Sequence, residues 1–430
     1  MAAGLGTRMR SATPKHLHPI LGRRMVDWVL EAARPLEPAP LVVIAARESR
    51  DAFGDTRVAV QEQPLGTGDA VRSSRAAIGT DAHDLLVLSG DTPLLTTELL
   101  AGLLETHRNE GAAATVLSFL PAEPRAYGRV VRGTDGTVEA IVEAGDATPE
   151  QLAVAECNSS IYVFRSELLW PALERLEPHN VQGELYLTDA VRGLVSSGNR
   201  VVAHVADDPA ETEGVNTRVE LAAAAAALRD RINHEHMLAG VAIADPSSTW
   251  IEPDVQLEAD ASIHPFTVLR GATRVASGAH VGPHVVAIDA EIGADATVGP
   301  FCYLRAGTVL GPRTKAGTFV EIKKSIIGQD SKVPHLSYIG DAEIGEDTNI
   351  GAGSITANFP HRPGQPKGKT TIGSNVRVAV DTMFVAPVTV GDDAWTAAGA
   401  VITDDVPDNT LAGFPPRQIN KEGRGGKRHD

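Results

Sequence analysis

The chain has 430 residues, two of them cysteines, and a formal net charge of -16 at pH 7. This length allows two or three domains with sizeable cores. The excess of negative charge argues against nucleic acid or an anionic membrane as a partner, so an anionic ligand requires a local group of cationic residues. Cys157 and Cys302 are too few for a disulfide framework, and no segment reads as a signal peptide or a membrane span. The sequence therefore predicts a cytoplasmic protein.

Strand-like and helical segments alternate over the first half of the chain. The apolar runs at residues 39–46 and 84–89 are continuous, as in strands that are buried on both faces. A helical pattern follows at residues 97–107. This alternation predicts an α/β domain, Rossmann-like, with a mostly parallel sheet, and we assign it to residues 1–206.

The pattern changes twice after that domain. The Ala-rich stretch at residues 220–240 predicts a connecting helix, which we place in a linker at residues 207–240. From Ile251 onward, apolar residues recur at intervals of six, and the series restarts twice after a shift in phase. A repeat of six is typical of a parallel β-helix, in which short strands stack as a triangular prism. We expect a left-handed β-helix over residues 241–430. The three series are Ile251, Leu257, Ile263, Leu269, Val275 and Val281, then Ile292, Val298, Leu304 and Leu310, then Ile372, Val378, Phe384 and Val390.

The first residues of the chain have the composition of a loop that binds phosphate. Gly4 and Gly6 allow backbone N–H groups to approach a ligand closely, and Arg8 and Lys15 supply fixed positive charge. Such loops usually follow a buried strand, and here the loop follows Met1 almost directly. The residues alone leave two interpretations open, a phosphate site and a glycine-containing tail.

Three later segments are candidates to complete this site. Gly66–Gly68 form a second turn able to present backbone donors, and Asp91 follows an apolar run, where ligands of open α/β sheets collect. Asn216 offers an amide oxygen that can join Asp91 as a hard-oxygen ligand for Mg²⁺. Each feature taken alone is more often an ordinary turn.

Taken together, eight short motifs resemble one enzyme family. They are "AAGLGTRM", "PKHLH", "QPLGTGDA", "SGDTPLL", "AYGRVV", "IVEAGDAT", "GELYLTD" and "EGVNTR", in this order. With the six-residue repeat that follows, nearly the whole chain resembles the bifunctional N-acetylglucosamine-1-phosphate uridyltransferases and glucosamine-1-phosphate N-acetyltransferases. The first loop is then a phosphate loop. In that family an apolar strand precedes it, and we expect a start assigned too late rather than a compromised copy.

The resemblance implies roles for the residues of the first domain. Arg8 and Lys15 are expected to steady the triphosphate of UTP as catalytic residues, and Asp91 and Asn216 to hold Mg²⁺. Ser89 stands where the family commonly has Tyr. The remaining positions are expected to bind the nucleotide or N-acetylglucosamine 1-phosphate: Ala2, Ala3, Gly4, Gln61, Gly66, Thr67, Ser89, Gly90, Gly128, Glu143 and Asn158.

A second site is expected where the six-residue repeat is interrupted, because interruptions of a solenoid are often functional loops. His335 and Tyr338 lie in such a segment, and a neutral His can accept the proton of an attacking amine. A lone His is more often packed or at the surface, but the resemblance makes His335 the general base. It also makes Arg305 and Lys323 the phosphate contacts and Tyr338 and Asn349 the sugar contacts.

Acetyl-CoA is the second co-substrate that the resemblance implies. At the expected acetyl-CoA site the sequence departs from the family's motifs. The loop at residues 358–368 is longer, and Pro415 replaces an arginine. These departures predict a raised Michaelis constant for acetyl-CoA. Arg362, Lys367 and Arg417 are the available replacements for the lost charge. The expected cofactor-binding positions are Ala352, Asn358, Phe359, Lys369, Val380, Ala398 and Arg417.

The resemblance therefore implies a homotrimer that first acetylates glucosamine 1-phosphate and then transfers uridylyl from UTP, giving a sugar nucleotide for cell-wall synthesis. An alternative is a uridyltransferase whose β-helix is only a trimerisation scaffold, which Val380 and Pro415 favour. A third hypothesis, a non-catalytic sensor of sugar nucleotides, requires the short N-terminus to be real.

Overall fold

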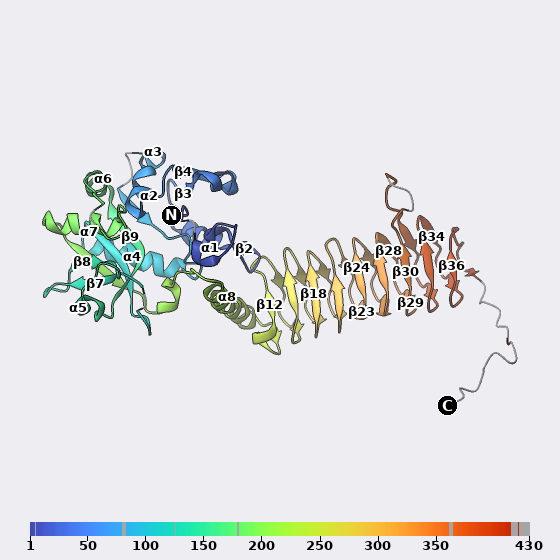
Figure 1. Cartoon of the computed structure of the whole chain (residues 1–430). Coiled ribbons are helices and arrows are strands. Elements are labelled where there is room, and N and C mark those ends of the chain that lie inside the picture. The colour runs from blue at the N-terminus through green and yellow to red at the C-terminus, as the bar shows by residue number, and fades with distance from the viewer. Residues whose placement is uncertain are drawn as a thin grey trace, which may run out of the picture. The chain divides into compact units, whose positions relative to one another are not determined.

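The computed structural model describes residues 1–4, 6–79, 83–124, 126–178, 180–360, 364–413 and 420. It divides into two compact units, Met1–Ala227 and Leu228–Asp430, and the boundary falls within helix α8 (Arg218–Leu238) (Figure 1). Each unit has a core of its own, as the change of sequence pattern predicts.

The first unit is built on a six-stranded sheet with the order β10-β6-β9-β7-β8, in which β5 also pairs with β9. Its strands are β5 (Asp84–Val87), β6 (Ala114–Phe119), β7 (Arg129–Arg132), β8 (Val138–Val142), β9 (Cys157–Arg165) and β10 (Val201–Val205). A separate parallel pair is formed by β3 (Val42–Ala46) and β4 (Arg57–Gln61), and a short hairpin by β1 (Pro19–Ile20) and β2 (Arg23–Arg24). Strands β3 and β5 lie within the segments predicted from sequence, and helix α4 begins as predicted and ends two residues later, at Asn109.

This fold is Rossmann-like, but its sheet is mixed rather than mostly parallel. Strand β10 is parallel to β6, whereas β9 runs antiparallel to β5, β6 and β7. The expectation was wrong here because a strand buried on both faces is continuously apolar whichever way its neighbours run. Strand β5 has such a run at residues 85–87, yet it pairs antiparallel with β9.

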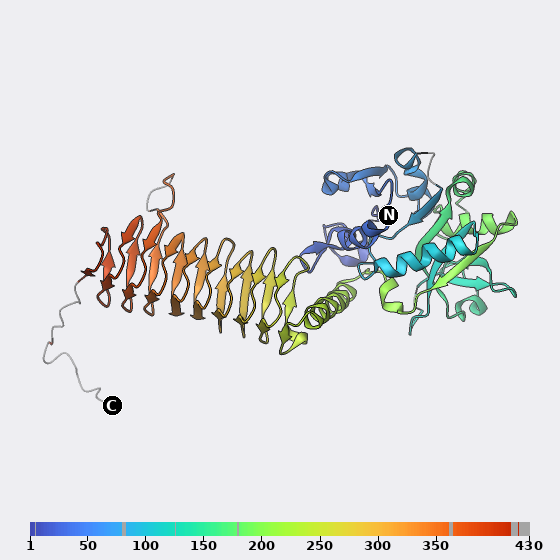
Figure 2. The ribbon, with the colours of Figure 1, turned by 180° about the vertical axis from the view of Figure 1, so that it is seen from behind.

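Helices cover both faces of the sheet. They are α1 (Met25–Ala33), α2 (Thr67–Ser73), α3 (Arg75–Ile78), α4 (Thr97–Asn109), α5 (Pro149–Leu152), α6 (Ser166–Glu174) and α7 (Leu187–Ser196). Because side chains alternate along a strand, β9 contributes Tyr162 and Phe164 to one core with α6 and α7, and Ile161 and Val163 to another with α1 and α4. Figure 2 shows α4, in cyan, lying across its face of the sheet.

An apolar groove lies between β3 and β5, next to the first residues of the chain. Its walls include side chains of α1, β3 and β5, among them Val26, Ile44 and Leu85. Ala2 forms a parallel bridge to Ala45 at one end of the groove, and the Ala2 N–H donates to the Ile44 carbonyl over 2.7 Å. The first loop therefore begins at the edge of β3.

The second unit is a parallel β-helix of three faces, formed by strands of two to four residues. The first face is formed by β11 (Ala242–Ile243), β14 (Ser262–Ile263), β17 (His280–Val281), β20 (Thr297–Val298), β23 (Lys315–Thr318), β26 (Lys332–His335), β29 (Asn349–Ile350), β32 (Arg377–Val378), β35 (Trp395–Thr396) and β37 (Leu411–Ala412). The second face is formed by β12 (Trp250–Ile251), β15 (Val268–Arg270), β18 (Val285–Ile288), β21 (Cys302–Leu304), β24 (Glu321–Lys323), β27 (Tyr338–Gly340), β30 (Ile355–Ala357), β33 (Met383–Val385) and β36 (Val401–Ile402). The third face is formed by β13 (Gln256–Leu257), β16 (Arg274–Val275), β19 (Glu291–Ile292), β22 (Val309–Leu310), β25 (Ile326–Ile327), β28 (Ala342–Ile344), β31 (Thr370–Ile372) and β34 (Val388–Val390).

The six-residue repeat is confirmed as the inward-facing row of each face. Ile263, Leu269 and Val275 come from three successive faces of one coil, and Ile263 pairs in register with Val281 of the next coil. All four side chains are buried. The coils stack along one axis (Figure 1), and the longer connection between β30 and β31 leaves the stack.

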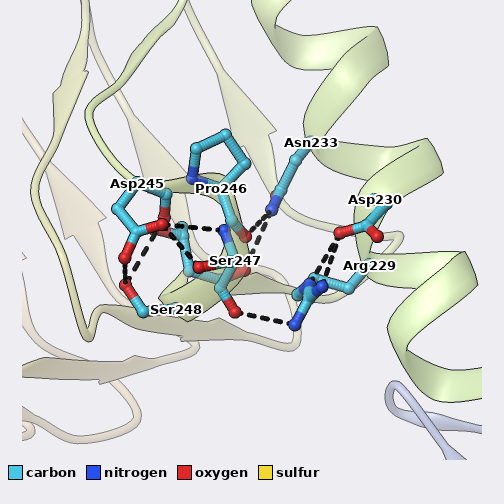
Figure 3. A network of polar contacts seen from close by, with 8 residues as sticks. Arg229, Asp230, Asn233, Asp245, Pro246, Ser247 and Ser248 are labelled. Carbon is cyan, nitrogen blue, oxygen red and sulfur yellow. Dashed lines mark hydrogen bonds and ion pairs between the residues drawn. The ribbon is translucent and has the colours of Figure 1, made fainter. Parts of the chain in front are cut away.

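A polar network joins the C-terminal half of α8 to the first coil of the β-helix (Figure 3). The Asn233 side chain is fully buried, and its Nδ2 donates to the carbonyls of Pro246 and Thr249, each over 2.9 Å. Arg229 donates to the Ser247 carbonyl over 2.7 Å. Asp245 caps the same turn, since its Oδ1 accepts from the Ser247 N–H over 3.1 Å. The helix therefore closes this end of the β-helix and satisfies carbonyls that have no strand to pair with.

Candidate active sites

Four side chains that are far apart in the sequence converge beside the first loop. The Lys15 ammonium forms an ion pair with the Asp91 carboxylate and donates to Asn216 Oδ1 over 2.8 Å. Arg8 donates to the same Asn216 oxygen, also over 2.8 Å. The structure thus brings together the four residues predicted to hold the triphosphate and Mg²⁺.

Local structure fixes the two oxygen-bearing members of this group. Asp91 follows β5, and its carbonyl accepts from the Val215 N–H over 2.8 Å, which ties the two segments together. Asn216 lies just before α8, where the Glu220 side chain accepts from the N–H groups of Asn216 and Thr217 over 2.7 and 2.8 Å. The Glu220 N–H in turn approaches the Thr217 hydroxyl oxygen, a reciprocal helix cap that positions Asn216.

Asp91 is ionised in this setting. Burial by itself raises the pKa of a carboxyl group, but the Lys15 charge and hydrogen bonds from Lys15 and Ser89 outweigh it, and the pKa of Asp91 lies below its usual value. The Lys15 ammonium therefore stands as a cation between one carboxylate oxygen and one amide oxygen. Among the described residues no group of three or more His, Cys, Asp or Glu side chains is placed to hold a metal ion.

The turn at Gly66 lies at the entrance to α2 and cannot accept a side chain. Gly66 has φ of 114°, and a Cβ there would lie 2.6 Å from the Leu185 carbonyl oxygen. The Gln61 amide donates to the Gly66 carbonyl over 3.1 Å, and the Thr67 hydroxyl accepts from the Leu187 N–H over 2.9 Å. Gln61, Gly66 and Thr67 thus belong to one hydrogen-bonded turn.

The start of the chain packs closely against Gly90, because a Cβ on Gly90 would lie 2.8 Å from the Met1 carbonyl oxygen. Around Gly4 the space is open.

A cavity of about 840 Å³ lies beside Glu143 and is lined by parts of β8, α6 and α7. Burial raises the pKa of Glu143, and Thr188 donates to its Oε1 over 3.3 Å. Gly128 is adjacent, since a Cβ there would lie 3.3 Å from Glu143 Oε2. Asn158 is buried, and its amide is held by Tyr162 and the Ser160 N–H.

In the second unit, the predicted sugar-phosphate residues lie on the second face and its adjoining corner. Arg305 follows β21, and it donates to Glu321 Oε1 of the next coil over 2.8 Å. Glu321 pairs in register with Tyr338, and Lys323 pairs with Gly340. His335 is exposed at the end of β26, in register with Thr318. Asn349 lies one coil further on the first face, in register with Lys332.

The predicted acetyl-CoA positions form a column at the corner between the first and second faces, which also holds His335, whereas Arg305 and Lys323 lie where the second face leads into the third. The Asp381 N–H donates to the Ala352 carbonyl over 2.7 Å, and the Gly399 N–H to the Val380 carbonyl over 2.9 Å. Ala352, Val380 and Ala398 are therefore equivalent positions of successive coils, and the register of β26 with β29 places His335 one coil before Ala352. Val380 and Ala398 are exposed. The column is an open path that starts at the predicted general base.

Comparison with known proteins decides the family. Residues 1–193 match the MobA-like NTP transferase domain. The chain is 48% identical to the bifunctional protein GlmU of Streptomyces coelicolor, with 98% of this chain and 92% of the relative covered. It is 46% identical to bifunctional GlmU proteins of Mycolicibacterium vanbaalenii and Mycobacterium tuberculosis, with 98% of this chain and 91% and 90% of those relatives covered.

The chain belongs to the GlmU family. The predicted enzyme class is thereby confirmed: it is a bifunctional transferase of UDP-N-acetylglucosamine synthesis, with acetyltransferase and uridyltransferase activities. In the part of the chain that the structure describes, no helix is both long and apolar enough to cross a membrane.

The loop between β30 and β31 carries two lysines with different neighbours. Lys369, predicted to bind the cofactor, forms an ion pair with Glu343 over 2.6 Å at the surface. Lys367 lies against Lys323, and this contact lowers the pKa of Lys323. The Lys367 Nζ is 5.7 Å from the centre of the Phe359 ring. Phe359 is exposed. Asn358, which precedes it in the chain, is buried and donates a hydrogen bond to Asp341.

Sequence reasoning missed two candidate site residues, Lys367 beside Lys323 and Thr188 beside Glu143. Lys367 was considered only as a coenzyme A contact, because the changed loop length hid which lysine meets Lys323. Thr188 lies within the quoted motif "GELYLTD", and that motif was the signal that could have found it. Arg417, Pro415 and Arg362 lie outside the described residues.

Proposed function

We propose that the first unit carries uridylyl transfer at the group formed by Arg8, Lys15, Asp91 and Asn216. The observation that supports this most is the convergence of two cations and two oxygen ligands from four separate segments. Arg8 and Lys15 neutralise the triphosphate while the sugar-phosphate oxygen attacks the α-phosphorus of UTP and pyrophosphate leaves.

Asp91 and Asn216 would hold Mg²⁺ in this site. Their fit is supported by the Lys15 ammonium, a cation already bound to one oxygen of each side chain. Carboxylate and amide oxygens together with phosphate oxygens are the ligands that Mg²⁺ prefers. When bound, Mg²⁺ supplies positive charge that offsets the charge developing on the phosphates.

Both substrates have candidate contacts in the first unit. We assign the uridine to Ala2, Ala3, Gly4 and the hydrogen-bonded turn of Gln61, Gly66 and Thr67, with Ser89 and Gly90 beside the phosphates. We assign the N-acetylglucosamine to the cavity beside Glu143, with Gly128, Asn158 and Thr188 as further contacts. The raised pKa of Glu143 suits a carboxyl group that exchanges hydrogen bonds with sugar hydroxyl and amide groups.

For acetyl transfer we propose that His335 accepts the proton of the glucosamine amine as the nitrogen attacks the thioester carbonyl. A C–N bond forms, the C–S bond breaks, and coenzyme A leaves as a thiol. Arg305 and Lys323 bind the sugar phosphate, and Tyr338 and Asn349 bind the sugar. The corner column of Ala352, Val380 and Ala398 accommodates the pantetheine arm, and Asn358, Phe359, Lys369 and Arg417 are proposed as further contacts of acetyl-CoA.

Lys367 is proposed as a third cation for the sugar phosphate, because its ammonium lies against that of Lys323. Two like charges in contact repel each other, and an anion between them relieves the repulsion. We expect Lys367→Ala to raise the Michaelis constant for glucosamine 1-phosphate about tenfold, the effect of losing one charge-assisted contact. The matched control is Lys369→Ala. It removes a lysine two residues along the chain, whose ammonium is paired with Glu343. Equal effects of the two substitutions in steady-state kinetics would refute the assignment.

A homotrimer is proposed from the apolar strip formed by the second face and its corner with the first face. At the corner, Phe266, His284, Phe301 and Phe319 stack with ring centres 4.7, 4.7 and 5.3 Å apart. The three phenylalanines are 55%, 48% and 58% exposed. The outward row of the second face is largely apolar as well: Trp250, Val268, Val286, Tyr303, Glu321, Tyr338, Ile355, Met383 and Val401. A strip of this extent is suited to a second copy of the chain.

The trimer is tested by placing charge in the strip. Phe301 and Phe319 have φ of 54° and 57°, a conformation that Asp tolerates, so the double change Phe301→Asp and Phe319→Asp preserves the backbone. We expect it to yield a monomer by light scattering, with acetyl transfer lost if neighbouring subunits share the site. Ile326→Asp on the third face, 49% exposed, is the control and is expected to leave the trimer intact. A monomeric unaltered protein would contradict the proposal.

The cytoplasm is the proposed location. Cys157 and Cys302 are both buried and unpaired, which suits a reducing compartment, and UTP and acetyl-CoA are cytoplasmic metabolites.

A further inference from the structure

The two oxygens of the Asp91 carboxylate have different partners. Oδ2 forms the ion pair with Lys15, at the cation position that Asn216 shares. Oδ1 accepts a hydrogen bond from the Ser89 hydroxyl over 2.7 Å. The Asp91 side chain is only 17% exposed, so solvent has little access to compete for either oxygen.

The backbone holds Ser89 and Asp91 in this relation. The Thr92 side chain is buried, and its hydroxyl donates to the Ser89 carbonyl over 2.8 Å. The Gly90 N–H donates to the Met1 carbonyl over 2.8 Å, and the Asp91 carbonyl accepts from Val215. The turn after β5 is therefore bonded on each side, and the Ser89 hydroxyl fixes the rotation of the carboxylate that the turn carries.

A carboxylate with one oxygen already bonded presents a single oxygen to a cation. Mg²⁺ requires near-octahedral coordination at short range and binds carboxylates through one oxygen, whereas Ca²⁺ accepts longer distances and carboxylates that bind through both oxygens. We propose that Ser89 is a positioning residue that restrains Asp91 to one-oxygen binding and so favours Mg²⁺ over Ca²⁺. This inference rests on the proposed role of Asp91 as a metal ligand.

The test measures metal binding directly in the full-length protein with UDP-N-acetylglucosamine bound. Free Mn²⁺ is followed by electron paramagnetic resonance, and Mg²⁺ and Ca²⁺ are titrated as competitors. We expect Ser89→Ala to weaken Mg²⁺ binding about tenfold, the usual cost of removing a group that orients a metal ligand, and to change Ca²⁺ binding much less. Ser89→Thr keeps the hydroxyl and is expected to keep the preference for Mg²⁺.

The outcomes separate the inference from the proposed function. An unchanged ratio of Mg²⁺ to Ca²⁺ affinity in Ser89→Ala overturns the inference, and so does an equal loss of preference in Ser89→Thr, because the hydroxyl is then not the cause. If Asp91→Ala binds Mn²⁺ as tightly as the unaltered protein, the proposed metal site itself is wrong. Thermal unfolding of each variant shows whether a change in affinity follows from misfolding.

Discussion

Asp91→Ala is expected to reduce uridylyl transfer by about a thousandfold or more and to leave acetyl transfer nearly unchanged. The substitution removes a proposed ligand of Mg²⁺ and the partner of Lys15, so both cations lose their place beside the triphosphate. Acetyl transfer is expected to survive because its proposed residues all belong to the other compact unit. Pyrophosphate release from UTP and N-acetylglucosamine 1-phosphate measures the first activity, and thiol release from acetyl-CoA the second.

The matched control for this substitution is Asp84→Ala, at the opposite end of β5. Asp84 is also an aspartate beside a cation, Arg108, and its other neighbour is His107, whose pKa is lowered by burial; it lies at the other end of β5 from Asp91. We expect Asp84→Ala to retain both activities. A loss of both activities in a folded Asp91→Ala protein, or equal effects of the two substitutions on pyrophosphate release, would contradict the assignment of the site.

The β-helix could be predicted in detail because its local and long-range patterns coincide. Each inward position such as Leu269 or Val275 contributes to the core of its own coil and pairs with the same position one coil away, so a repeat of six specifies both. The segment of His335 and Tyr338, expected to interrupt the repeat, instead belongs to the regular strands β26 and β27. The loop at residues 358–368 was visible only as a departure from the family's motif. Which of its lysines meets Lys323 depends on the path of the loop, and the repeat does not determine that path.

The sheet of the first unit could be predicted only in part. Strands β3 and β5 were expected because their apolar runs record burial on both faces. Strand direction depends on which distant segment lies alongside. Strand β9 pairs with β5 and β6, and both lie more than thirty residues away from it along the chain. The sequence of β9, in which Asn158, Ser159 and Ser160 precede the apolar residues, carries no mark of this direction.

In the site of the first unit, too, local features could be predicted from sequence and long-range contacts could not. Asp91 was identifiable because it follows a buried strand, whereas its contact with Lys15 joins positions 76 residues apart, which composition and spacing do not reveal. The resemblance to a family supplied that link. The hydrogen bond from Ser89 to Asp91 is local, but only the observed rotation of the carboxylate shows that it divides the two oxygens between different partners.

His335→Ala is expected to reduce acetyl transfer by about a hundredfold to ten-thousandfold and to leave uridylyl transfer nearly unchanged. An amine that attacks a thioester must lose a proton, and His335 is exposed at the start of the corner column proposed for the pantetheine arm. Because His335 is not assigned to substrate binding, the Michaelis constants for glucosamine 1-phosphate and acetyl-CoA are expected to change little. The loss should therefore appear in kcat, measured by thiol release.

His280→Ala tests whether the effect is specific to His335. His280 lies on the same face, three coils earlier in β17, and stacks on His264 rather than facing the sugar-phosphate residues. Its loss is expected to leave acetyl transfer within about twofold, as for a surface substitution away from a site. If His335→Ala instead raises both Michaelis constants with kcat unchanged, His335 contributes to binding and the proton of the amine is lost to solvent before attack. If His335→Ala has no effect on either constant, the corner column is not the acetyltransferase site, and the alternative of a β-helix that serves only as a scaffold becomes the better account of the second unit.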